Sequence, residues 1–343
     1  MKSAILVGMK VDKGRLCLVL TIGVGFAAGI AFGYRVAPAQ GVDATSFFDR
    51  ISPVRSANSK FKLVHPLLTY ETPEATPLLE YASLKKKVRD IVNHATTTKI
   101  ASDVSVYYRD LNSGRWIALR RNVIYYPASL LKVPVMIAYF RKEESDPTLF
   151  EQRIIYTPLS TGDTFEAPSK LVTGRSYSIR ELIEDMIIES DNGAAYTLLS
   201  KIDAGLLSEV YTDLGIQDPG NDSSKYEISA KTYALFFRVL YNATYLTPEA
   251  SEQALELLMR TSYKEGLVAG VPADVPVAHK YGEHVVSDGA TVQGVELHDC
   301  GIVYRPEHPY LLCVMTSAKD LSTASALISS ISKAVYEDSG TAK

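Results

Sequence analysis

The chain has 343 residues, of which 36 are basic and 39 acidic, and 46% are hydrophobic. This length allows one large domain or two small ones with a sizeable core. The near balance of charge gives no electrostatic basis for binding nucleic acid, so we expect no nucleic-acid partner. The six histidines and three cysteines do not show the spacing of a zinc site.

The N-terminal region has the composition of a membrane anchor. Residues 16–34 contain no charged side chain and follow a basic segment, residues 1–15. Their length roughly matches a bilayer core, and a basic flank stays in the cytoplasm. We interpret residues 1–15 as a cytoplasmic flank and residues 16–34 as an uncleaved, single-pass transmembrane anchor. Cleavage after Ala39 is the competing interpretation, and both place the rest of the chain outside the cytoplasm.

Residues 35–75 are mixed in composition and carry scattered prolines. We expect them to form a linker that docks locally through the Phe-Lys-Leu-Val stretch at 61–64. From about residue 76 the hydrophobic spacing becomes regular. Residues 76–340 are therefore expected to form the folded domain.

Within that domain, a hairpin and a late run of strands bracket a central helical block. This order indicates an α+β fold, most simply an antiparallel sheet with helices packed on it. The predicted helices cover 78–92, a segment beginning near Ser129, 178–190, 228–243 and 320–336. The predicted strands lie in a hairpin at 103–119 and in segments 275–286, 291–305 and 310–318.

The cysteines do not form a disulfide framework, because there are three of them and Cys17 lies in the predicted anchor. Cys300 and Cys313 flank a proline-containing turn and are expected on two paired strands. We expect them to be diagonal neighbours rather than directly opposite, which favours two buried free thiols over a disulfide.

Ser129 and Lys132 are three positions apart in an otherwise apolar segment, so a helix would place both on one face. Pro134 indicates that this helix begins close to Ser129, where the helix dipole stabilises negative charge. A deprotonated lysine can activate a serine, provided that desolvation or another cation lowers its pKa from about 10.4. Taken alone, the pair also fits a helix cap and a surface lysine.

Ser190-Asp191-Asn192 is a second candidate motif, and it follows an apolar stretch. All three residue types favour helix N-caps, so a helix start is the simplest interpretation. The functional alternative is that Ser190 relays a proton to a leaving group and that Asn192 binds a substrate amide.

Lys280-Tyr281-Gly282 is a third candidate motif, within a predicted strand. Lys280 could hold a substrate carboxylate and supply the positive charge that lowers the pKa of Lys132. Gly282 would let the substrate backbone approach the strand closely. An exposed lysine beside a bulge glycine is the alternative.

In this order, S-x-x-K, S-D-N and K-x-G resemble the trio of class A β-lactamases and penicillin-binding proteins. The resemblance to the class A β-lactamase-like serine hydrolase domain covers residues from about 80 to 338. It implies an antiparallel five-stranded sheet flanked by helices, an all-helical subdomain, and no metal or cofactor. The most similar segments are 104–140, 176–202 and 228–259.

The resemblance also implies roles for individual residues. Ser129 would be the nucleophile that forms an acyl-enzyme, Lys132 its base or electrostatic partner, and Ser190 the proton donor to the departing nitrogen. The implied substrate-binding residues are Asn192 for an amide, Lys280 for a carboxylate, and Tyr281, Gly282 and Glu283 on the same strand. The oxyanion hole would consist of the backbone N–H groups of Ser129 and Glu283.

Two departures from the family pattern affect what can be carried over. Tyr281 replaces a threonine whose hydroxyl helps to bind the substrate carboxylate. The Ω loop is short, and residues 214–232 lack the E-x-x-L-N pattern that positions the hydrolytic water in β-lactamases. The only glutamate there, Glu227, is a weak deacylation candidate because it directly precedes a helix. We therefore expect slow deacylation.

Three hypotheses follow from these residues. The first is a membrane-anchored β-lactamase-like hydrolase acting on small β-lactams, and the overall resemblance favours it. The second is a cell-wall D,D-peptidase acting on D-Ala-D-Ala-type peptides, which the missing E-x-x-L-N pattern favours. The third is a non-catalytic binding module, suggested by Tyr281 and opposed by the intact set of Ser129, Lys132, Ser190 and Asn192.

Overall fold

The computed structural model describes residues 52–55, 60–71, 81–158, 169–220, 223–287 and 291–339. Residues 50–343 form one compact unit. The predicted flank at 1–15 and the predicted anchor at 16–34 lie outside the described residues. Among the helices of the ranges given above, none is long and apolar enough to cross a membrane.

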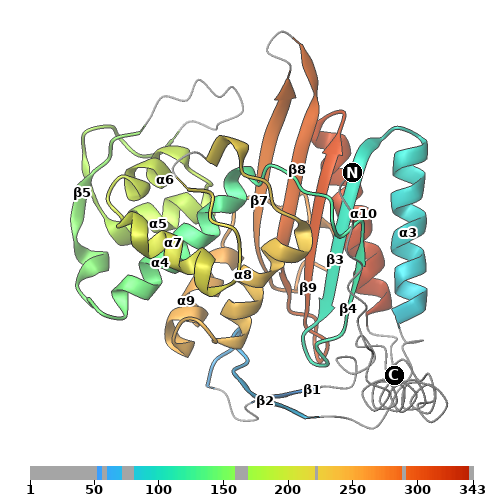
Figure 1. Ribbon diagram of the computed structural model, residues 1–343, viewed down its shortest axis with the longest axis horizontal. Helices are drawn as coiled ribbons and strands as arrows, with labels where there is room; N and C mark the ends of the chain where they lie inside the picture. The colour runs from blue at the N-terminus through green and yellow to red at the C-terminus, as the bar shows by residue number, and fades with distance from the viewer. Residues whose placement is uncertain are drawn as a thin grey trace, which may run out of the picture. The chain divides into compact units, whose positions relative to one another are not determined.

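A five-stranded antiparallel sheet forms the centre of this unit, with the strand order β4-β3-β9-β8-β7 (Figure 1). The predicted hairpin and the three predicted late strands are all confirmed. The first hairpin closes where Asp110 Oδ1 accepts from the Ser113 backbone N–H at 2.6 Å. The strands are β3 Ala101–Asp110, β4 Trp116–Leu119, β7 Val277–Ser287, β8 Val292–Val303 and β9 Tyr310–Ala318.

Helices cover both faces of the sheet, which confirms the α+β architecture with a helical subdomain. The terminal helices α3 and α10 pack on one face, and the block from α4 to α9 lies on the other side (Figure 1). The helices are α3 Ala82–Thr97, α4 Lys132–Glu143, α5 Ile179–Ile188, α6 Asn192–Leu199, α7 Ala204–Asp213, α8 Ala230–Asn242, α9 Pro248–Met259 and α10 Leu321–Asp338.

Short elements complete the unit. Two small hairpins are present, one formed by β1 and β2 and the other by β5 and β6. Their bounds are β1 Ser52–Arg55, β2 Leu67–Glu71, β5 Arg153–Ile155 and β6 Ser176–Ser178. The 3-10 turns are η2 Ala128–Leu131, η3 Leu149–Glu151, η4 Ser223–Lys225 and η5 Val268–Gly270.

Alternation along the strands divides the core into two layers. On β3, Tyr107 faces the block of α4 to α9, whereas its neighbours Val106 and Tyr108 face α3 and α10. The helices begin where the sequence supplies caps: Ser178 and Glu181 form a capping box at the start of α5. The site therefore rests on a rigid sheet with helices fixed at their N-termini.

The predicted docking of residues 61–64 is confirmed. The Glu252 carboxylate on α9 accepts hydrogen bonds from the backbone N–H groups of Lys62, Leu63 and Val64, at 2.8 to 3.1 Å. The Leu63 and Val64 side chains are buried in the helical layer of the core. This part of the expected linker thus belongs to the folded unit.

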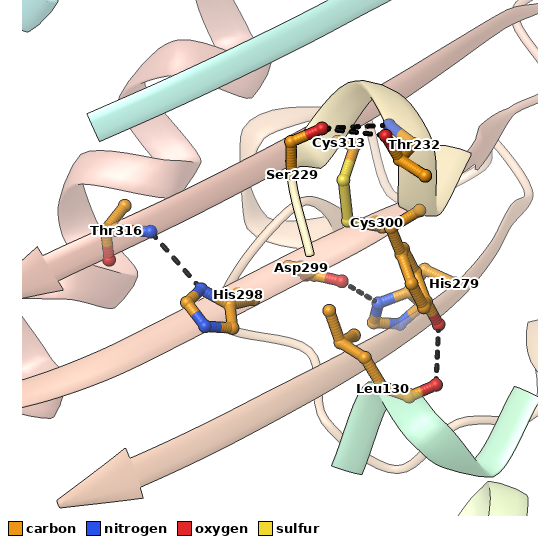
Figure 2. The surroundings of a disulfide bond; sticks show 10 residues. Leu130, Ser229, Thr232, His279, His298, Asp299, Cys300, Cys313 and Thr316 are labelled. Carbon is orange, nitrogen blue, oxygen red and sulfur yellow. Dashed lines mark hydrogen bonds and ion pairs between the residues drawn. A yellow bond between two sulfur atoms is a disulfide. The ribbon is translucent and has the colours of Figure 1, made fainter. Parts of the chain in front are cut away.

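The expectation for Cys300 and Cys313 is wrong. They lie directly opposite each other on β8 and β9, and they form a disulfide. The strand register, which the turn length alone did not reveal, decides this point. Lys280 on β7 is the register partner of Cys300. Figure 2 draws the surroundings of the disulfide, which include Ser229 and Thr232 at the start of α8 and Leu130 of η2.

Candidate active site

Ser129 lies on the 3-10 turn η2, which leads into α4 at Lys132. The predicted helix start is therefore confirmed, with the refinement that its first turn is 3-10. Ala128, just before the serine, has φ of 49°, a left-handed conformation that alanine seldom adopts. Such backbone strain is common at functional sites and persists only where the surroundings hold it. Here Tyr233 on α8 contributes by donating a hydrogen bond to the Leu130 carbonyl at 2.9 Å.

Ser190 also has a left-handed backbone, with φ of 59°, in the turn between α5 and α6. The next residue, Asp191, is the N-cap of α6 and accepts from the Ala194 backbone N–H at 2.6 Å. The capping interpretation of this motif therefore holds for Asp191. It leaves the neighbouring Ser190 and Asn192 side chains available to the site.

Two lysines meet at the Ser190 hydroxyl. Lys132 Nζ donates to Ser190 Oγ at 3.1 Å and to Asn192 Oδ1 at 2.6 Å, and it also contacts the Ser190 carbonyl. Lys280 Nζ donates to the same Ser190 Oγ at 2.8 Å. The structure thus brings together four of the residues that the three motifs predicted. Both lysines are buried, with 5% of Lys132 and none of Lys280 exposed.

Burial lowers the pKa of Lys280 well below its usual value, and the adjacent Lys132 charge lowers it further. Burial disfavours the charged form of a lysine, and two neighbouring ammonium groups also repel each other. The sequence predicted that Lys280 lowers the pKa of Lys132, and the structure brings the two ammonium groups together on one shared hydroxyl. A substrate carboxylate at this point would favour the protonated form of Lys280.

Gly282 brings β7 against the Ser129 turn. A Cβ atom at this position would lie 2.7 Å from the Pro127 carbonyl oxygen and 3.0 Å from the Leu130 nitrogen. The sequence attributed this glycine to close approach of the substrate backbone, whereas the backbone that approaches it here is η2 of the same chain. The two predicted oxyanion donors, the N–H groups of Ser129 and Glu283, lie on these two adjoining segments.

Tyr281, the departure from the family's threonine, has its ring beside rather than inside the cleft described below. Its ring stacks on Tyr263 with centroids 4.2 Å apart, and Lys280 Nζ lies 4.3 Å from the Tyr281 ring centroid. A cation over an aromatic face is attracted by the ring quadrupole. Tyr281 therefore contacts Lys280, the lysine predicted to bind the substrate carboxylate.

A cleft of about 680 Å³ opens beside Ser129. Its lining includes Ser129, Lys132, Asn192, Glu283 and His284, which we call the nucleophile wall. It also includes Leu207, Ser208, Tyr211, Asp218, Pro219 and Gly220, on α7 and in the segment after it, which we call the α7 wall. Apolar residues of α4 and α6 complete the lining. The volume suits a small molecule or a short peptide end.

Glu227, the weak deacylation candidate, is exposed and is absent from the residues that line this cleft. It interacts electrostatically with Glu296 on β8, a residue that the sequence analysis missed. Burial and, to a smaller extent, the Glu227 charge raise the pKa of Glu296 to about 7. Glu296 is the register partner of His284. Only the strand register could have revealed this acid, because no local motif marks it.

Comparison with known proteins agrees with this geometry. The β-lactamase enzyme family matches residues 83–338. No curated protein sequence is significantly similar to the chain. Among solved structures, that of PBP-A is 21% identical and has a TM-score of 0.62; the match covers 77% of this chain and 97% of that one.

Two solved β-lactamases are similar to the same extent. The enzyme from Xanthomonas campestris is 20% identical with a TM-score of 0.63, over 74% of this chain and 98% of that one. The class A β-lactamase from Mycobacterium abscessus is also 20% identical with a TM-score of 0.63, over 74% and 99%. At this identity the structures establish a shared fold, and the family match spans most of the chain. The chain therefore belongs to the β-lactamase enzyme family.

Proposed function

We propose that this protein is a serine hydrolase that β-lactams acylate at Ser129. The observation that carries the proposal is the pair of lysines held on one hydroxyl beside the Ser129 turn. Such a pair keeps one amine able to accept a proton, because burial and like charge oppose double protonation. Lysine is almost never fully buried unless it is paired.

In the proposed reaction, Ser129 Oγ bonds to the lactam carbonyl carbon while its proton passes to Lys132. The Ser190 hydroxyl delivers a proton to the lactam nitrogen as the C–N bond breaks, and Lys132 restores the Ser190 proton. Water then cleaves the ester, which releases the ring-opened acid and regenerates Ser129. Lys280 holds the substrate carboxylate, and the N–H groups of Ser129 and Glu283 stabilise the oxyanion.

A D,D-peptidase is the second candidate, and the lack of a deacylation motif in the segment after α7 favours it. The segment following α7 contains no E-x-x-L-N pattern, and Glu227 does not line the cleft. Without a base that activates water, the acyl-enzyme breaks down slowly, as expected for an enzyme whose natural acyl donor is a D-alanyl peptide. Both candidates share the acylation step.

The test is labelling of the full chain, solubilised in detergent, with a fluorescent penicillin. We expect a covalent adduct that peptide mass spectrometry locates at Ser129. The Ser129→Ala variant should not label, whereas Ser200→Ala, at the end of α6, should label like the wild type. Absence of an adduct on folded protein would overturn both enzyme hypotheses and leave the third, a non-catalytic binding module.

The lifetime of the adduct separates the two enzymes. Release within seconds indicates a β-lactamase, and persistence for many minutes indicates a penicillin-binding peptidase. We expect persistence, because nothing in residues 214–232 matches the deacylation motif. Release of a D-alanine from a D-Ala-D-Ala peptide would then identify the peptidase reaction directly.

We also propose that residues 16–34 anchor the protein in the cell membrane, with the catalytic domain on the extracytoplasmic side. The apolar segment behind a basic flank supports this. The Cys300–Cys313 disulfide supports it as well, because disulfides persist mainly outside the reducing cytoplasm. Protease added to intact cells should digest the domain, whereas a cytoplasmic domain would be protected.

A further inference from the structure

One face of α6 leads away from the nucleophile. Asn192, Ala195 and Leu199 all line the cleft, and their spacing of three and four residues places them on one side of the helix. Seven residues of helix extend about 10 Å. Leu199 keeps 43% of its surface exposed, although it is a large apolar side chain. A substrate group held at Asn192 would therefore continue along an apolar surface.

The α7 wall lines the same cleft as this surface and ends in a carboxylate. Leu207, Ser208 and Tyr211 present another helical face to the cleft, and Asp218 follows in the next segment. Asp218 is held in place: its carboxylate accepts from the Gly220 backbone N–H at 2.8 Å and from the Ser208 hydroxyl. It is a fixed, half-buried acid beside apolar groups.

Asp218 lacks a cationic partner within the described ranges, where it has neither an ion pair nor a lysine or arginine hydrogen bond. Lys132, which lines the cleft, and the buried Lys280 are engaged with Ser190 instead. The segments 159–168, 221–222 and 288–290 contain no lysine or arginine in the sequence. Burial raises the pKa of the Tyr211 phenol, and the negative charge of Asp218 raises it further.

We propose that the cleft selects acyl donors whose side chain ends in a primary amine: an apolar spacer lies on α6 and α7, and the ammonium group pairs with Asp218. This inference rests on the proposed acylation of Ser129 and specifies its substrate class. The physical reason is complementarity. A half-buried carboxylate without a cationic partner is stabilised more by pairing with an ammonium group than a fully exposed carboxylate is.

The experiment compares three penicillins that carry a 6-aminohexanoyl, an N-acetyl-6-aminohexanoyl or a hexanoyl side chain. Each competes with fluorescent penicillin for the full wild-type chain, and the second-order acylation rate is obtained from the loss of labelling. The three probes share the reacting ring and differ only in the end of the side chain. We expect the free amine to acylate about fivefold faster than both neutral probes at low ionic strength, a size typical of a partly exposed ion pair.

The ratio of amine to acetylated probe is then measured in two variants. In Asp218→Asn, which keeps the size and the acceptor oxygen of the side chain, the ratio should fall to about one. In Asp213→Asn, an exposed acid at the end of α7 outside the cleft, the ratio should remain that of the wild type. Because each ratio is taken within one protein, a change in overall labelling rate does not affect it.

A salt series on the wild type keeps the proposal testable if Asp218→Asn does not fold. The amine preference should shrink as sodium chloride rises to 0.5 M, about the range in which exposed charges are screened. Equal rates for the three probes on labelled wild-type protein would overturn the proposal. Failure of fluorescent penicillin to label the wild type is a different result, because it overturns the proposed function itself.

Discussion

The two walls of the cleft are built differently. At the nucleophile wall, the adjoining residues Ala128 and Ser190 have a left-handed backbone. Lys132 of this wall shares the Ser190 hydroxyl with the buried Lys280. The α7 wall is mostly apolar and contributes a carboxylate that its own segment holds in place. The difference indicates a division of labour: acylation needs charges preorganised by the fold, whereas recognition of a side chain needs complementary shape and charge. The two walls should therefore respond very differently to small changes.

The largest expected effect comes from adding one methyl group to β7, next to Glu283 of the nucleophile wall. The matched control adds one methyl group to α7. In Gly282→Ala the new Cβ would collide with the Pro127 carbonyl and push β7 away from the Ser129 turn. We expect acylation by fluorescent penicillin to slow by about 100-fold or more, since a displacement of about 1 Å has that effect. Gly205→Ala, in the first turn of α7, has a nearest neighbour at 3.2 Å and should change the rate less than twofold. Equal effects of the two variants would contradict the division between the walls.

The next effect concerns the buried charge next to Lys132 of the nucleophile wall. Lys280→Met removes an ammonium that would hold a substrate carboxylate, so acylation should fall by about tenfold or more, a size typical of charged hydrogen bonds. The same change should alter the pH dependence of stability. Because the folded pKa of Lys280 lies below its unfolded value of about 10.4, the unfolded chain binds more protons between these values.

Wild-type stability relative to Lys280→Met should therefore rise with pH from the folded pKa of Lys280 up to about 10.4. Urea unfolding of both proteins at several pH values measures this difference. A difference that does not vary with pH would show that Lys280 titrates normally and that the two lysines do not oppose each other. Lys231→Met, on the solvent side of α8, is a suitable exposed control.

The smallest effect is expected at Glu296, beside the cleft. Its folded pKa of about 7 lies above its ordinary value of 4.5, so it contributes stability below pH 4.5 that is lost as the pH rises to 7. Glu296→Gln lacks this pH dependence. Its free energy of unfolding should therefore rise relative to that of the wild type across this interval, by about 1 kcal/mol, because solvent screens a half-exposed group. Buried His298, with a pKa of about 4, acts in the opposite direction in both proteins and cancels in the comparison. A constant difference between pH 4 and 8 would refute the raised pKa.

The sequence by itself determined the elements and the motif residues, because these depend on local information. Hydrophobic periodicity located the late strands β7 to β9 and the helices α5 and α8, and motif order singled out Ser129, Lys132, Ser190 and Lys280. The chemistry of a helix start and of a strand lysine follows from neighbours within a few positions. The docking of residues 61–64 was also evident from one apolar stretch.

Only the tertiary structure decided which distant atoms meet. Strand register placed Cys300 opposite Cys313 and Glu296 opposite His284, and a shift of one residue would have changed both pairs. The packing of η2 against β7 explained Gly282, and the convergence of α4, α6 and β7 placed two lysines on Ser190. Asp218 belongs to no motif, and it acquires meaning only because the fold makes it part of the cleft wall. Contacts between residues far apart in the chain depend on packing and register, which local patterns do not encode.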